Sequence, residues 1–167
     1  MRSWPPLHGP ERESLLSWLQ LHRDTLALKC ADLDAEQLCT RSVPPSTMSL
    51  IGLVRHMAEV ERHWFRRLLA GESRDIAGPI YYSEANRDGD FDDVDPSTVE
   101  EAMVAWRAEC ERADAIVAGL DLDDTRVQVD RGVTSVRWVL THMIEEYARH
   151  NGHADLLREC IDGSTGD

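Results

Sequence analysis

The sequence predicts an all-α fold, a four-helix bundle with a long crossover between the second and third helices. Apolar residues recur at helical spacing in four long segments, and no strand pattern competes with them. The longest connection between these segments covers residues 71–96. Structureless connections of more than about 12–15 residues are uncommon unless they have a function. We therefore interpret this one as a crossover along the bundle axis, which makes the flanking helices parallel and can pass over a functional site.

The first helix is predicted from about Glu11 to Ala31. Its apolar residues lie on or near one side, at Leu15, Leu16, Leu19, Leu26 and Leu28. A short helical turn is predicted at Asp34–Leu38. The prolines of "RSVPPST" then interrupt the chain, because proline cannot occupy a helix interior without breaking it. We expect Ser46 or Thr47 to cap the next helix.

The second helix is predicted from about Met48 to Ala70, with Gly71 as its terminator. Apolar residues recur along it at Leu50, Val54, Met57, Trp64 and Leu68. We expect Trp64 and Phe65 to pack in the core rather than contact a substrate.

A capping box at Ser97–Glu100 is predicted to start the third helix. Its apolar residues follow alternating steps of four and three, at Val99, Met103, Trp106, Cys110, Ala113, Val117 and Leu120. Such a seam is typical of a packed bundle helix. A connection over residues 119–135 then leads to the fourth helix, predicted from about Ser135 to Ile161.

Length and charge restrict the classes of function. The 167 residues suit a single domain, 1–167. With 18 basic and 31 acidic residues, the formal net charge is −13, which argues against nucleic acid or an anionic membrane surface as a partner. A divalent cation would not be repelled. No apolar run approaches the roughly 18 residues that span a bilayer.

The cysteines and the N-terminus favour a cytoplasmic location. The four cysteines, which include no CxxC pair, are Cys30, Cys39, Cys110 and Cys160. We interpret them as reduced, mostly core-lining thiols. The opening "MRSWPPLHGPERE" contains no apolar signal region, so we expect no secretion.

The fourth helix contains an unusual pair of polar residues on its apolar side. Its apolar stripe consists of Val136, Val139, Leu140, Met143, Tyr147, Leu157 and Ile161. The same seven-residue repeat places Glu146 and His150 inward. Positions four apart differ by about 40° and about 6 Å of rise, so both side chains can bind one ion. Burying a carboxylate is costly unless it is paired or binds a metal. A hydrogen-bonded pair without metal is the alternative.

Neighbouring residues on this helix fit the ion less well. Glu145 lies about 140° from His150, and His153 lies about 10 Å along the helix from Glu146. We assign His153 either to the surroundings of the site or to the surface. His142 lies about 80° off the face and is expected to be exposed.

A third ligand must come from another helix. His56 and His63 lie seven residues apart on one side of the second helix, and spacing alone does not choose between them. His22 and His8 are further options, each expected to be exposed.

Two blocks of sequence resemble one known superfamily. They are "MSLIGLVRHMAEVERHWFRRLLAGE" at Met48–Glu72 and "SVRWVLTHMIEEYARHNGHADLLRECIDG" at Ser135–Gly163. Both are similar to the DinB-like (damage-inducible protein) metal-binding bundles, in particular the mycothiol-dependent branch with maleylpyruvate isomerase and mycothiol S-transferases. The resemblance covers almost the whole chain. It implies a four-helix bundle of up-down-down-up topology and is compatible with a homodimer.

The resemblance also implies a ligand set. In that branch a divalent metal, usually zinc, is bound by one histidine of helix two and a Glu-x-x-x-His pair of helix four. These positions correspond to His56 in "GLVRH" and to Glu146 and His150 in "EEYARH". Most other DinB-like proteins have histidine in place of Glu146. Three protein ligands leave a coordination position open, as in catalytic zinc sites.

The function implied is that of a zinc-dependent mycothiol S-transferase acting on small electrophiles. A metal-coordinated thiol is deprotonated and becomes the nucleophile. Glu146 lowers the net charge of the metal site, while His153 and Arg149 are candidates for orienting the surrounding groups. Tyr81 and Tyr82 are candidates for the substrate mouth.

Two other functions remain open. A metal-binding stress or regulatory protein without turnover would have His63 or His153 in the fourth position. A metal-dependent hydrolase would use metal-bound hydroxide. The isomerase has a second domain, whereas this sequence ends shortly after helix four, so we expect a single-domain transferase rather than an isomerase.

Overall fold

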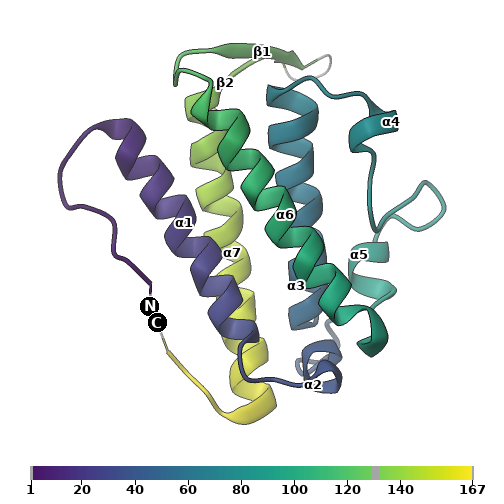
Figure 1. Ribbon diagram of the computed structural model, residues 1–167. Helices are drawn as coiled ribbons and strands as arrows, with labels where there is room; N and C mark the ends of the chain where they lie inside the picture. The colour runs from purple at the N-terminus through teal and green to yellow at the C-terminus, as the bar shows by residue number, and fades with distance from the viewer. Residues whose placement is uncertain (1, 129–131, 167) are drawn as a thin grey trace.

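Four long helical segments dominate the computed structural model, which describes residues 2–128 and 132–166 (Figure 1). They are α1 (Glu11–Cys30), α3 (Leu50–Glu61) with its continuation η1 (Arg62–Leu69), α6 (Val99–Ala118) and α7 (Val136–Asp162). Along their lengths α1 packs against α7, and α3 packs against α6. The prediction of a mostly helical protein is confirmed.

Short elements occupy the connections. They are α2 (Ala35–Cys39), α4 (Arg74–Ala77), α5 (Gly89–Asp92), the 3-10 turn η2 (Pro96–Thr98), β1 (Thr125–Gln128) and β2 (Gly132–Ser135). The crossover thus contains α4 and α5 and runs along the outside of α3 (Figure 1). No described helix has an apolar stretch long enough to cross a bilayer.

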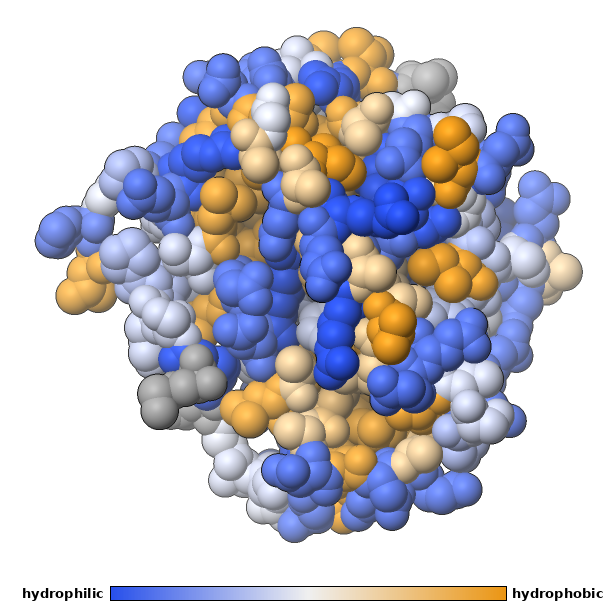
Figure 2. All heavy atoms as spheres, viewed as in Figure 1, coloured by the Kyte–Doolittle hydropathy of each residue, from blue (hydrophilic) through white to orange (hydrophobic). Residues whose placement is uncertain are grey.

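The core lies where the long helices meet. Its largest fully buried side chains are Tyr147, Phe65, Leu19, Leu26, Leu50, Ile51, Leu53, Met57, Leu69, Leu140, Met143 and Leu157. The expected core packing of Trp64 and Phe65 is confirmed, since they are 5% and 0% exposed, but Trp64 also forms part of the wall of a cavity. Hydrophilic residues cover most of the face in Figure 2, and hydrophobic residues form small scattered patches there.

The second long helix changes geometry halfway. From Arg62 to Leu69 it is a π-helix, and the N–H of Ala70 donates to the carbonyl of Phe65 at 2.9 Å. The predicted extent of this helix, about Met48 to Ala70, is confirmed, and Gly71 ends it as predicted, with φ +72°. The expected 3.6-residue recurrence is wrong beyond Glu61. Because a π-helix has more than 3.6 residues per turn, α-helical periodicity does not describe this segment.

Helix caps differ from two predictions. Ser49, rather than Ser46 or Thr47, caps α3, because its hydroxyl accepts the N–H of Gly52 at 3.1 Å. The capping box predicted at Ser97–Glu100 is absent. Instead, the side chain of Asp95 accepts the N–H of Ser97 at 2.8 Å and starts η2, which precedes α6.

A small hairpin joins α6 to α7, where the sequence predicted only a connection. Strands β1 and β2 pair antiparallel, with Thr125 opposite Ser135. Residues 129–131 of this connection lie outside the described residues. Each strand has only four residues, and Val127 and Val133 are exposed, so no apolar alternation marks the pair.

The cysteines agree only partly with the core-lining prediction. All four are free thiols, but Cys160 is exposed, while Cys39 and Cys110 are partly buried. Burial raises the pKa of the buried Cys30 thiol to about 12. This thiol therefore stays protonated and unreactive at neutral pH.

A buried polar network links the long helices. The Arg23 guanidinium of α1 donates to both carboxylate oxygens of Glu61 on α3, each at 2.8 Å. The Tyr147 hydroxyl donates to Glu61 at 2.8 Å and accepts from the Trp106 indole at 2.8 Å. Burial, reinforced by the Glu61 carboxylate, raises the pKa of Tyr147, so its hydroxyl remains a donor. Because Tyr147 follows Glu146, this network fixes α3 and α7 beside the candidate metal ligands.

Candidate metal centre

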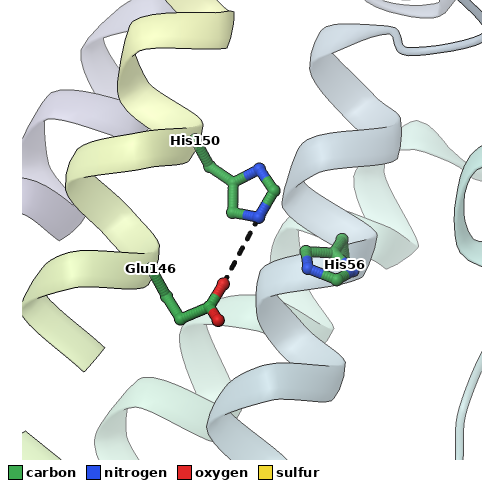
Figure 3. Close-up of side chains that lie close together, drawn as sticks. All are labelled: His56, Glu146 and His150. Carbon is green, nitrogen blue, oxygen red and sulfur yellow. Dashed lines mark ion pairs between the residues drawn. The ribbon is translucent and has the colours of Figure 1, made fainter. Parts of the chain in front are cut away.

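His56, Glu146 and His150 meet between α3 and α7 (Figure 3). One possible ligand atom from each residue lies within 4.8 Å of those of the other two. The Nε2 atom of His150 lies 3.5 Å from an oxygen of Glu146, and the rings of His56 and His150 are 4.7 Å apart between centroids. The structure thus brings together the three residues for which the sequence predicted a shared metal.

The donor set fits zinc. Two imidazoles and one carboxylate are common zinc ligands, and tetrahedral ligands at zinc distances lie about 3.3 Å apart. The 3.5 Å separation of His150 and Glu146 is close to that value. The side chains of His56, Glu146 and His150 are 26%, 19% and 11% exposed, so a small molecule can reach the site.

Electrostatics favour a neutral His150. Burial, followed by the influence of His56 and His153, lowers the pKa of His150 to about 4. At neutral pH the imidazole therefore offers a lone pair instead of a positive charge, which is the form that binds metals.

Asp90 is a site residue that the sequence did not identify. It belongs to α5 in the crossover, is 5% exposed, and its carboxylate lies 2.8 Å from Nδ1 of His56. A carboxylate on one imidazole nitrogen is the usual partner of a metal-binding histidine, and it leaves Nε2 for the metal. The signal was hidden, because the acidic stretch "DGDFDD" offers several equivalent carboxylates.

Removing the Asp90 charge is expected to weaken metal binding. In Asp90→Asn, His56 loses the partner that sets its orientation and increases its basicity, which typically costs about 10–100-fold in affinity. Competition titration with a chromophoric zinc chelator measures this loss. The matched control is Asp92→Asn, which removes an exposed carboxylate from the same short helix. Equal affinities of the two variants would contradict the role of Asp90.

His142 is not exposed as predicted. Its ring stacks on Trp138 at 4.9 Å and meets the edge of Trp64 at 4.7 Å. Its Nε2 lies 3.4 Å from Glu146, on the oxygen that does not face His150. Although His142 lies about 80° from the inward face of the helix, the His142 and Glu146 side chains are long enough to meet. His142 therefore helps to orient Glu146.

Glu145 joins His142 and Glu146 in a second group within 4.8 Å. These residues all belong to α7, and the Glu145 side chain is 56% exposed. No residue of another helix completes this group within the described chain, so it lacks the enclosure of the first group.

The remaining candidates lie around the centre or away from it. The Nδ1 atom of His153 lies 3.4 Å from Nδ1 of His150, on the side turned away from Glu146. Arg149 stays at the surface, 64% exposed and 3.9 Å from Glu145.

The other histidines do not join the three residues. His63 is exposed and packs edge-on against Trp64, with ring centroids 5.1 Å apart. His22 is partly buried rather than exposed, and its carbonyl accepts from the Asn151 amide at 3.0 Å. His8 is exposed, as expected.

A cavity of about 660 Å³ opens beside His56, between α3, η1 and the crossover. Phe91, Trp64 and Tyr82 contribute to its wall. Tyr81 does not, because it packs beneath the Arg55 guanidinium, 4.4 Å from its ring centroid. Of the two tyrosines proposed for a substrate mouth, only Tyr82 is in place.

Comparison with known proteins gives one match. The model of a family described as Mycothiol-S-transferase matches residues 14–163. No curated protein and no solved structure matches the chain significantly.

Proposed function

The chain belongs to the mycothiol-S-transferase family, and from this premise we propose that it transfers mycothiol to small electrophiles in a reaction that depends on a divalent metal, zinc in our assignment. The observation that carries the metal dependence is the convergence of His56, Glu146 and His150 beside an open cavity. Two neutral imidazole nitrogens and one carboxylate would hold the divalent ion, and the site as a whole would then have a net charge of +1.

When bound, zinc supplies acidity: it lowers the pKa of a coordinated thiol, so that the sulfur nucleophile forms at neutral pH. The residues of the chain hold this arrangement in place. Asp90 orients His56, and His142 and His150 contact opposite oxygens of Glu146. The thiol sulfur forms a bond to an electrophilic carbon of the second substrate. At the same carbon a bond breaks, either to a leaving group such as a halide or to the oxygen of an epoxide ring. The sulfhydryl proton passes to solvent, which reaches the partly exposed side chains.

Conjugation of a reporter electrophile tests this function. Zinc-loaded protein with mycothiol and monochlorobimane is expected to form the fluorescent adduct, and His150→Ala is expected to be slower by at least about 100-fold, because one metal ligand is missing. Arg112→Ala, which changes an exposed side chain of α6, serves as the control and keeps the wild-type rate. Equal rates for His150→Ala and the wild type would contradict the catalytic role. Thiol-independent ester hydrolysis would identify a hydrolase, and neither activity would leave a metal-binding protein without turnover.

Further features belong to the same proposal. We assign the four long helices to a DinB-like bundle of up-down-down-up topology, forming one domain over 1–167. A cytoplasmic location agrees with the four free thiols and with a thiol cosubstrate. A homodimer stays a prediction.

A further inference from the structure

The crossover forms one wall of the cavity beside His56. Three side chains of the neighbouring helix hold this wall in place. Arg55, Glu59 and Arg62 lie four and three residues apart along α3 and the start of η1. A Glu59 oxygen accepts the N–H groups of Ile80 and Tyr81 at 2.6 and 2.5 Å. The crossover is therefore attached to the helix next to Trp64 and His56, which line the cavity.

The other two attachments lie on either side of Glu59. Arg62 donates to the carbonyl of Gly78 at 2.7 Å, and Arg55 donates to the carbonyl of Gly89 at 2.8 Å. At Gly89 a Cβ would lie only 2.4 Å from the carbonyl oxygen of Tyr81, so the chain passes itself closely there. These contacts give the cavity a preformed wall, which is the usual condition of a small-molecule site.

The lining combines aromatic rings with charges of both signs. Trp64, Tyr82 and Phe91 supply rings, and Phe91 stacks on His56 with centroids 5.1 Å apart. Arg74, Arg87, Glu84 and Asp88 also line the cavity and are exposed, so they supply both donors and acceptors.

This chemistry suits a neutral molecule with many hydroxyl groups. Each hydroxyl can both donate and accept, so it can use arginine and carboxylate partners together. The ring C–H groups of a sugar can pack on aromatic side chains, whose large surfaces dominate such contacts. In all, two arginines and four carboxylates line the cavity, and Glu59 and Asp90 are already hydrogen-bonded within the chain. A strongly charged ligand of either sign would therefore meet like charges.

Mycothiol has this chemistry at the end opposite its sulfur. Its acetylated cysteine is joined through an amide to a glucosamine that carries an inositol. The cavity begins at His56, one of the three candidate metal ligands, and extends along the crossover to Arg87 and Asp88. Its volume of about 660 Å³ lies within the range of about 300–1,000 Å³ of small-molecule sites.

The other side of Trp64 differs in character. There Trp138 and His142 stack on each other, and Trp138 is 47% exposed. Neither residue lines the cavity. This aromatic surface lies outside the cavity and can take an apolar electrophile, so the two reactants would approach from different sides of Trp64.

We propose that the cavity between α3, η1 and the crossover binds the glucosamine–inositol portion of the thiol cosubstrate, with Tyr82 and Arg87 as determinants of thiol specificity. This proposal rests on the proposed function, because it takes mycothiol as the thiol. It adds the place where the sugar portion lies and the residues that recognise it.

Comparing two thiols tests the proposal. Tyr82→Ala and Arg87→Ala are each expected to raise the KM for mycothiol by about 10-fold, as expected for the loss of about 1.4 kcal/mol of binding, and to leave the KM for N-acetylcysteine unchanged. The control Arg112→Ala changes neither value. Zinc content and the circular dichroism spectrum of each variant check that the fold is retained. Equal changes for both thiols, or no change for mycothiol, would overturn the proposal.

A binding experiment separates this proposal from the transferase activity. N-acetylglucosaminyl-inositol, which keeps the neutral amide of mycothiol and has no sulfur, is titrated calorimetrically into zinc-loaded protein. Saturable binding that Arg87→Ala weakens about 10-fold would support the cavity assignment. If the same protein conjugated no electrophile, that failure would count against the transferase activity and not against the cavity assignment. Conjugation of mycothiol by a protein that shows no binding of N-acetylglucosaminyl-inositol would overturn the cavity assignment and retain the transferase.

Discussion

The variant His150→Ala is expected to lose zinc affinity by at least about 1,000-fold. Even an outer partner of a metal ligand is typically worth about 10–100-fold, and His150 is assigned to the metal directly. Its removal leaves His56 and Glu146 on different helices, with only solvent to complete the coordination. Competition titration against a chromophoric chelator, at constant pH, gives the two dissociation constants.

His153→Ala is the matched control for this prediction. It removes the same kind of side chain from the same helix, three residues further along, where the imidazole contacts His150 and not Glu146. We expect its zinc affinity to stay within about 10-fold of the wild type. Wild-type affinity in His150→Ala would show that the metal is bound elsewhere. An equal loss in both variants would contradict the ligand set, because His153 would then matter as much as His150.

Glu61→Ala is expected to destabilise the protein by about 3–5 kcal/mol. Glu61 is fully buried, and its removal takes the bidentate partner from the Arg23 guanidinium, which is 4% exposed and keeps only the exposed Asp114 carboxylate. It also leaves the buried Tyr147 hydroxyl without its acceptor. Removing one partner of a buried ion pair typically costs about 3–5 kcal/mol. This is a large part of the total free energy of unfolding of a domain, roughly 5–15 kcal/mol. Urea unfolding followed by circular dichroism measures the change in the free energy of unfolding.

Two further variants separate the charge from the lost volume. Arg23→Leu combined with Glu61→Leu removes both charges, and we expect it to be more stable than Glu61→Ala, since no buried charge is left without a partner. Glu111→Ala, at an exposed position of α6, is expected to change stability by less than about 0.5 kcal/mol. A loss below 1 kcal/mol in Glu61→Ala would mean that the network contributes little.

The sequence predicted the long helices because apolar periodicity reports burial directly. The same regularity placed Glu146 and His150 inward, since both follow the seven-residue repeat that includes Met143 and Tyr147. It failed at η1, where hydrogen bonds such as that from Ala70 to Phe65 replace the α-helical pattern. Nothing in the residue types of that segment distinguishes the two kinds of helix.

The relation between helices could not be obtained from spacing. His56 and His63 occupy equivalent positions on one helix, and only the family resemblance favoured His56. Asp90 reaches His56 from the crossover, a contact that depends on how Arg55 and Glu59 hold that segment. Such contacts arise from tertiary packing between residues far apart in the chain, which no local pattern encodes.

X-ray absorption spectroscopy at the zinc edge of the metal-loaded protein tests the metal centre most directly. The account predicts one zinc ion per chain with two imidazole nitrogens at about 2.0–2.1 Å, one carboxylate oxygen, and no sulfur ligand before thiol is added. His56→Ala should reduce the imidazole signal to one ring. A cysteine sulfur in the resting spectrum at about 2.3 Å, or a centre without two imidazoles, would contradict the assignment of His56, Glu146 and His150.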